Sequence, residues 1–283
     1  LPALAFPLHA GGQIHVDAGR RLTVRLDTIS TNGDLNNDGT ITGNVQASTI
    51  SDWGNVNGKV TWNSPAKAFP SSTVPEMYAN LGTAITPGPS IDRGVLGPGY
   101  NPWGTTNADG VYVIRTNGDL TITNSRIFGT LVVICPGHKV TLGGQMLLQP
   151  ARTDFPALIV NGNLVLQYTS ASTSLSEAAQ ATNYNPPGAP YQGANDADRL
   201  DQYPSEIQGL VHVTGTLDIQ QNALVRGAIL CESTASTDAV RIRQDAEIVY
   251  DTNLYTNPPQ GYTTAVKMVP QTGSWRQVVD PSP

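Results

Sequence analysis

Apolar and polar residues alternate in five short segments of the chain. Each segment places Leu, Val or Ile at its first and third positions, and the five are residues 120–122, 140–142, 164–166, 217–219 and 240–242. Their starting positions are 20, 24, 53 and 23 residues apart. The first three segments therefore recur at about 22 residues, and so do the last two. Alternation with a period of two is typical of strands, and a unit this short must stack on its neighbours to bury its apolar side. The pattern therefore predicts an all-β fold, a single-stranded parallel β-helix (a solenoid) of about 22 residues per coil.

The remaining sequence divides into segments of different composition. Residues 13–63 carry short apolar stretches separated by Asn-Gly and Asp-Gly pairs, which indicate the first β-helix coils and their corners. Residues 64–109 are a Pro- and Gly-rich insertion, in which residues 74–82 predict one short helix that ends at the glycine. The main coils are expected over residues 110–250, interrupted by a polar loop excursion at 168–208.

Capping segments are expected because both ends of a solenoid expose unpaired strand edges. The short helix is expected to cap one end, and packing along the side of the coils is the alternative. Residues 251–283 are expected to fold back as a C-terminal cap that uses Tyr262, Met268 and Trp275.

Residues 1–12 form an apolar, proline-broken N-terminal extension that predicts neither a helix nor a central strand. Exposed apolar side chains of this size need a partner surface. Two docking modes stay open: a groove on the same subunit, or a neighbouring copy, which would make the extension an inter-subunit tail. The side chains concerned are Leu1, Leu4, Phe6 and Leu8. The chain opens at Leu rather than Met, which suggests a removed leader or anchor.

Composition narrows the classes of function. A net charge of −6 and a pI near 5.1 argue against nucleic acid as a partner. The sequence contains no run of about 18 apolar residues, so it predicts no membrane span. Only 13% of the residues are charged, and this composition favours a secreted or cell-surface protein. Cys135 and Cys231 are expected on the same side of one wall, either as a disulfide or as two buried free thiols.

One stretch has the D-x-N-x-D-G pattern of a calcium loop. Its alternating oxygen donors, Asp34, Asn36, Asp38 and Thr40, suit a hard cation that takes about six to eight oxygen ligands. The twelfth position of such a loop is Val45, where a bidentate carboxylate is needed, so a neighbouring coil would have to supply that ligand. Bound Ca²⁺ and a plain Asn- and Asp-rich turn both stay open, and no other cofactor is predicted.

The excursion gathers acidic and aromatic residues. The members of this candidate glycan or loop site are Tyr184, Tyr191, Asp196, Asp198, Asp201 and Tyr203. Carboxylates beside aromatic rings suit a cation or the face of a sugar, and two carboxylates at the right separation can hydrolyse a glycosidic bond. A solvated acidic loop without a ligand is the alternative.

Several coil segments resemble known β-helical families. The rungs ITGNV at 41–45 and GNVNGKV at 54–60 resemble bactofilins, which are polymer-forming cytoskeletal proteins. A closer resemblance, to the pilus-assembly-associated β-helical proteins of bacterial envelopes, rests on the segments GVYVI (110–114), GTLVV (129–133), PALIV (156–160), YPSEIQGLV (203–211) and NPPQGY (257–262). Members often carry a pilin-like hydrophobic N-terminus, which this chain lacks. The resemblance implies a structural protein and brings no catalytic residues with it.

These features predict a non-enzymatic protein, a secreted structural subunit of an extracellular or envelope filament whose partners are other copies of itself. The sequence has no serine-nucleophile elbow, no phosphate-binding loop and no histidine spacing typical of a metal enzyme. The alternative is a secreted β-helix that binds or cleaves polysaccharide, with the excursion as its site. An adhesin whose loop binds another protein is a third hypothesis.

Overall fold

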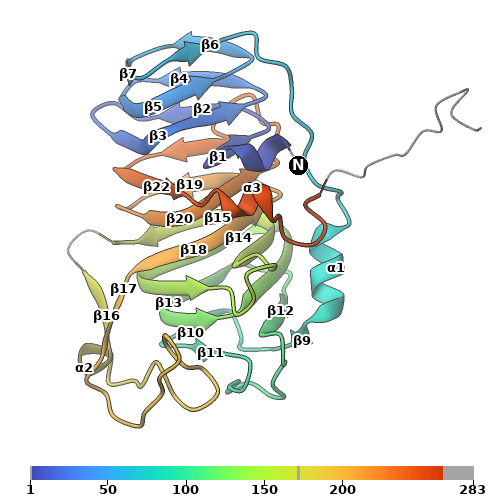
Figure 1. Cartoon of the computed structure of the whole chain (residues 1–283), viewed down its shortest axis with the longest axis vertical. Coiled ribbons are helices and arrows are strands. Elements are labelled where there is room, and N and C mark those ends of the chain that lie inside the picture. The colour runs from blue at the N-terminus through green and yellow to red at the C-terminus, as the bar shows by residue number, and fades with distance from the viewer. Residues whose placement is uncertain (1, 171–172, 264–283) are drawn as a thin grey trace, which may run out of the picture.

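The computed structural model describes residues 2–170 and 173–263, and its regular structure is almost entirely β-strand (Figure 1). Strands pair in parallel from one turn of the chain to the next and form three walls around a shared apolar core. One strand pair within the described residues, β16 (Ser174–Ser176) with β17 (Gln202–Pro204), is antiparallel. The prediction of an all-β fold is confirmed.

The walls are made of the following strands, given from the bottom of Figure 1 to its top, and a long strand that bends around a corner belongs to more than one wall. The first wall contains β9 (Thr83–Ala84), β12 (Val111–Arg115), β14 (Thr130–Gln149), β15 (Leu158–Tyr168), β18 (Glu206–Val213), β20 (Leu224–Cys231), β1 (Leu8–Ala10), β3 (Arg21–Thr31), β5 (Thr40–Gln46) and β8 (Val60–Thr61). The second wall contains β10 (Ser90–Asp92), β13 (Leu120–Phe128), β14, β15, β19 (Leu217–Ile219), β21 (Val240–Ile242), β2 (Ile14–Val16), β4 (Asp34–Asn37) and β6 (Thr49–Asp52). The third wall contains β11 (Val95–Leu96), β13, β14, β18, β20, β22 (Ala246–Tyr250), β3, β5 and β7 (Asn55–Asn57).

The chain enters the stack in its middle. From β1 it climbs to β8, and the following segment then runs down the outside of the walls to the helix α1 (Val74–Leu81) (Figure 1). From β9 the chain climbs again, and its last coil meets its first: β1 pairs with β20, and β2 pairs with β21. The coils of residues 13–63 therefore stack on the C-terminal end of the main coils.

The core consists of columns of aliphatic side chains that point inward from the strands. On the second wall one column contains Leu120, Val140, Leu164, Leu217 and Val240, all at most 1% exposed. It continues through Ile14 and Leu35, because β2 and β4 follow in register. Each coil thus buries its apolar side chains against the coils above and below. This burial is the dominant favourable contribution to the free energy of folding of such a stack.

The N-terminal extension is buried in its own chain. Leu8 lies in β1 and faces the core. Leu4 packs on the outer side of the first wall, in the same apolar cluster as Tyr262, and both leucines are fully buried. Phe6 is half-buried against the ring of His9, and Leu1 lies outside the described residues. The prediction of an inter-subunit tail is therefore wrong for Leu4 and Leu8: their apolar character serves core packing within one chain.

The helix predicted over residues 74–82 is present as α1, and Gly82 follows it as the C-cap residue. Val74 and Tyr78 pack on outward-facing aliphatic side chains of the first wall, such as Val113 and Val132. The helix therefore covers the side of the stack, and the expectation that it caps an end is wrong. The short helices are η1 (Pro2–Ala5), α2 (Glu177–Gln180) and α3 (Asn253–Thr256).

The described part of the C-terminal segment, residues 251–263, covers the outer side of the first wall. Tyr262 is fully buried there, and its hydroxyl lies 2.9 Å from Nδ1 of His212. Met268 and Trp275, which were expected in a C-terminal cap, lie outside the described residues.

The two cysteines are free and buried. The registers Val133–Val160, Val160–Val213 and Val213–Cys231 place three strand spacings, about 14 Å, between the coil of Cys135 and that of Cys231. A disulfide requires Cα atoms within about 7 Å, so this fold keeps the thiols apart. Burial raises the pKa of Cys231 to about 12, which keeps its thiol protonated.

His9 makes folding sensitive to mild acid. It is fully buried on the outer side of β1, with its ring centre 4.8 Å from that of Phe69. Burial, and then the charge of Lys67, lower the pKa of His9 from 6.5 to about 4. Between pH 6.5 and 4 the unfolded chain therefore binds a proton that the folded chain does not, so stability falls as the pH drops through this window.

We predict that the free energy of unfolding falls by about 3 kcal/mol between pH 7 and 4 because of His9 alone. Urea unfolding at a series of pH values measures this change. The variant His9→Phe, which fills the same space and never titrates, should flatten this part of the profile. The control His138→Gln, at a half-buried histidine away from the His9–Phe69 contact, should keep the slope that His9→Phe loses. An identical slope in His9→Phe and the unmodified protein would contradict the assignment.

Candidate functional site

The second wall is the open face of the molecule. The first wall is covered by α1, Phe155 and Tyr262, and the lower part of the third wall is covered by the excursion. Along the second wall the middle rank of outward side chains has no buried member. From bottom to top this rank contains Ser90, Thr121, Thr141, Val165, Asp218, Arg241, His15 and Asn36.

The lower half of this rank is uncharged. We name as the threonine face the outward side chains of Ser90, Thr121, Thr123, Thr141, Val165 and Gln167. The register is unbroken here: Thr121 pairs with Thr141, and Thr141 with Val165. Neighbouring side chains therefore stand about 4.8 Å apart along the stack and about 6.7 Å apart along a strand.

The threonine face is rigid and free for solvent. β-Branched side chains are restricted at χ1, and the strands beneath are paired on both sides. Within the described residues the hydroxyls of Thr121 and Thr141 form no hydrogen bond to the protein, whereas that of Thr123 donates to Asp92 at 2.8 Å. The face therefore presents methyl and hydroxyl groups in a fixed two-dimensional arrangement.

The upper half of the second wall is charged but internally paired. Arg241 Nε lies 3.0 Å from Asp17, and Arg243 Nε lies 2.9 Å from Asp218. His15 contacts Asp238 through Nδ1 at 2.7 Å and Asp38 through Nε2 at 3.1 Å. The charged side chains of this half therefore pair with one another. Desolvation alone would raise the pKa of Asp238, but the hydrogen bond from His15 and the charge of Arg241 outweigh it and lower that pKa.

The residues of the predicted calcium loop lie along this charged half. Asp34 and Asn36 are on β4, Asp38 lies at the turn beside His15, and Thr40 begins β5 on the next wall. Asp34 accepts hydrogen bonds from Gln13, Thr49 and Ser51, and these bonds outweigh desolvation and lower its pKa. The carboxylate of Asp34 is thus already satisfied by protein donors. The four predicted ligands do not form one loop, because they extend along β4 and its following turn to the start of β5 on another wall.

The excursion folds back on the lower third wall. Tyr184 and Tyr203 are at most 1% exposed and their rings pack edge to face, with Tyr191 against Tyr203 in the same way. The rings of Tyr184 and Tyr203 form the core of the excursion and present no open face to a sugar, and the half-buried Tyr191 packs against this core.

Arg126 holds the excursion in place. Its guanidinium is fully buried and donates to the carbonyl oxygens of Tyr184, Ala189 and Pro190 at 2.6 to 2.7 Å. Burial lowers the pKa of Arg126 to about 10, which leaves it charged at neutral pH. Three charge-assisted hydrogen bonds from its Nη atoms stabilise this buried charge, whereas its Nε has no partner within the described residues.

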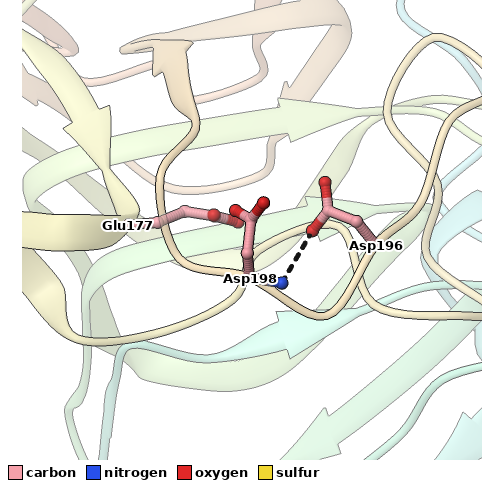
Figure 2. A group of neighbouring side chains, drawn as sticks. All are labelled: Glu177, Asp196 and Asp198. Carbon is pink, nitrogen blue, oxygen red and sulfur yellow. Dashed lines mark hydrogen bonds between the residues drawn. The ribbon is translucent and has the colours of Figure 1, made fainter.

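The acidic residues of the excursion meet a carboxylate that the sequence pattern does not mark. Glu177 of α2 joins Asp196 and Asp198, and one ligating oxygen from each lies within 4.8 Å of the others (Figure 2). Asp196 also accepts a hydrogen bond from the backbone N–H of Asp198 at 3.2 Å. Glu177 is 19 positions before Asp196, and no sequence spacing indicates that the excursion folds the two together.

Two solved structures similar to this chain are ice-binding proteins. A domain of the Shewanella frigidimarina ice-binding protein, of the DUF3494 class, has a TM-score of 0.37 and 11% identity, and the match covers 88% of this chain and 95% of that one. An ice-binding protein from an Antarctic biological consortium has a TM-score of 0.22 and 11% identity, over 87% of this chain and 88% of that one. No family model and no curated protein matches the sequence.

These comparisons correct the functional predictions. Neither solved structure is a bactofilin or a pilus-assembly protein, so that resemblance is wrong. The prediction of a self-polymerising filament subunit is wrong on the same findings, and Leu4 and Leu8 are buried within their own chain. The carbohydrate hypothesis is corrected too, because both structures are described as ice-binding and the rings of Tyr184 and Tyr203 are buried.

Neither of these two proteins is described as an enzyme. Across residues 2–170 and 173–263, none of the helices has the length and apolarity needed to cross a bilayer.

The anchoring role of Arg126 can be tested by proteolysis. Arg126→Met keeps the length of the side chain but leaves three carbonyls without donors, which should destabilise the excursion by about 3 kcal/mol. Trypsin should then cleave after Arg199, inside the excursion, more than about tenfold faster than in the unmodified protein. The control Arg152→Met removes an exposed arginine and should not change this rate. Equal cleavage after Arg199 in all three proteins would show that Arg126 does not anchor the loop.

Proposed function

We propose that the protein binds ice through the threonine face, as a secreted single-stranded parallel β-helix. The observation that carries the proposal is the unbroken register of Thr121, Thr141 and Val165 on the open wall. Coil lengths vary around the expected 22 residues: Val45 pairs with Val60, 15 positions on, and Val132 with Ile159, 27 positions on.

The physical argument starts from the ligand. An ice surface is a rigid lattice whose water molecules repeat in two dimensions, so it cannot adjust to an irregular protein surface. A binding face must therefore bring its own regular spacing, and the strand and stack spacings of a β-helix provide two fixed repeats. Because the side chains are already ordered, adsorption loses little conformational entropy.

The chemistry of the threonine face suits this ligand. A hydroxyl both donates and accepts hydrogen bonds, as water does, and the neighbouring methyl groups pack without strong hydration. Charged side chains hold their own water firmly, and the charged half of the second wall is for that reason excluded from the proposed contact area. Ice grows in the medium around cells, so this role is consistent with a secreted protein.

Adsorption to ice tests the proposal directly. The unmodified protein should be incorporated into a slowly growing ice phase and should produce thermal hysteresis. Thr141→Tyr places a bulky ring in the middle of the threonine face and should reduce both activities at least about tenfold, which corresponds to ~1.4 kcal/mol of adsorption free energy. Its melting temperature should stay close to that of the unmodified protein, because the position is on the surface.

The matched control is Thr42→Tyr on the third wall, where Thr42 is also half-buried and in register between Thr23 and Asn57. This variant should keep full activity. Exclusion of the unmodified protein from ice, or equal losses in the two variants, would refute the assignment to the threonine face.

A further inference from the structure

The segment that connects the top coil to α1 is fastened to the walls at few points. We name residues 64–70 the strap, which runs down the outside of the walls toward α1 (Figure 1). At its upper end the N–H of Ser64 donates to the carbonyl of Ala47 at 3.1 Å. Lower down, the backbone of Lys67 exchanges two hydrogen bonds with the side chain of Asn32, at 2.7 and 2.8 Å. Among the described residues no further hydrogen bond joins the backbone of the strap to the walls, so few contacts have to break for it to open locally.

A histidine is buried beneath the strap. His9 is fully buried on the outer side of β1, with its ring centre 4.8 Å from that of Phe69 in the strap and 6.2 Å from that of Phe6. Its ring nitrogens have no hydrogen-bond partner in the described part of the chain, and neither has the hydroxyl of Ser30, its fully buried register partner on β3. Buried polar atoms without partners are costly. Opening the strap would let water reach the ring of His9 and recover part of that cost.

The strap also carries a charge that acts on His9. Nζ of Lys67 lies 4.8 Å from the ring centre of Phe6, and the ring of Phe6 is in turn beside His9. Burial, and then the charge of Lys67, lower the pKa of His9 to about 4, whereas backbone groups of Ser30 and Lys67 raise it by less. The neighbours of the ring by contact and by register are uncharged: Phe6, Phe69, Ser30 and Leu230. Opening the strap therefore removes both the burial and the repulsion that disfavour a proton on His9.

We propose that the strap is a pH-sensitive cover over β1, which opens locally when His9 is protonated while the strands beneath stay paired. Strand β1 is held between β20 and β3 by parallel pairing that does not involve the strap. Opening therefore uncovers the outer side of the strand through which the first coil pairs with the last, and leaves Leu8 in the core. The proposal does not depend on ice binding, because the strap packs on the first wall and the threonine face lies on the second.

The direction of the pH dependence follows from the two forms of the strap. In the open form the ring of His9 is solvated and has its usual pKa of 6.5, whereas in the closed form its pKa is about 4. Between these two pH values the open form binds a proton that the closed form does not. The equilibrium constant for opening should therefore rise about hundredfold as the pH falls from 7 to 4, and level off below pH 4.

Hydrogen exchange of the full chain, followed amide by amide by NMR, tests the proposal. The N–H of Lys67 reports on the strap through its bond to Asn32, and the N–H of Ile229, which donates to the carbonyl of Pro7 at 2.9 Å, reports on the strands beneath. We expect Lys67 to be less protected than Ile229 at every pH, and its protection factor to fall about hundredfold between pH 7 and 4. Equal protection of the two amides, or a protection factor of Lys67 that does not change with pH, would overturn the proposal.

Variants separate the role of His9 from a general effect of acid. His9→Phe keeps a buried ring that cannot be protonated, so the protection factor of Lys67 should no longer change with pH. Asn32→Ala removes both hydrogen bonds that hold Lys67, so the strap should open more easily and the pKa of His9, read from its ring chemical shifts, should rise toward 6.5.

Lys67→Gln removes the charge on the strap but keeps the backbone, and it should also raise the pKa of His9. The matched control Lys139→Gln removes an exposed lysine elsewhere and should leave that pKa unchanged. The proposal fails if His9→Phe keeps the pH dependence of the Lys67 amide, or if the pKa of His9 is the same in Asn32→Ala as in the unmodified protein. Equal shifts in the two lysine variants would also contradict it.

Discussion

Parallel pairing between the first and last coils joins the two ends of the chain, and the rest of the fold depends on it. Strand β1 lies between β20 and β3, and β2 lies between β21 and β4. Without this contact the lower coils would end in an unpaired edge at residues 229–247, and the upper coils would have no surface to stack on. The apolar N-terminal residues form strand β1 of this joint, and Leu8 is a core residue because its side chain points inward from that strand.

The joint makes the second wall one continuous sheet with two chemical halves. In the lowest coils, Thr121, Thr141 and Val165 form a neutral face with fixed spacing. From Asp218 upward, on both sides of the joint, His15, Arg241 and their acidic partners satisfy one another. The backbone beneath both halves has the same geometry, so the difference in chemistry is decided by the outward residues alone. The excursion leaves the stack after β15 and packs on the third wall, so it does not cover the neutral half.

The alternating segments in the sequence identified the second wall: all five lie on it, and their inward residues form its core column. The alternation does not say which coil edges meet, because every strand edge offers the same backbone groups. The stacking of residues 13–63 on the C-terminal coils was therefore not predictable from periodicity. The same holds for the acidic group, since Asp196 and Asp198 were visible as a cluster, whereas Glu177 and Asn185 join them only through the folding of the excursion.

Disulfide trapping between the two ends of the chain tests the account most directly. His15 and Arg241 are in register on adjacent strands, about 4.8 Å apart, which is within reach of a disulfide. The double variant His15→Cys with Arg241→Cys should form an intramolecular bond under mild oxidation and run faster on a non-reducing gel. His15→Cys with Asp218→Cys, two strands apart, should not. Cross-linking of the second pair, or of neither, would contradict the joint and with it the continuous wall.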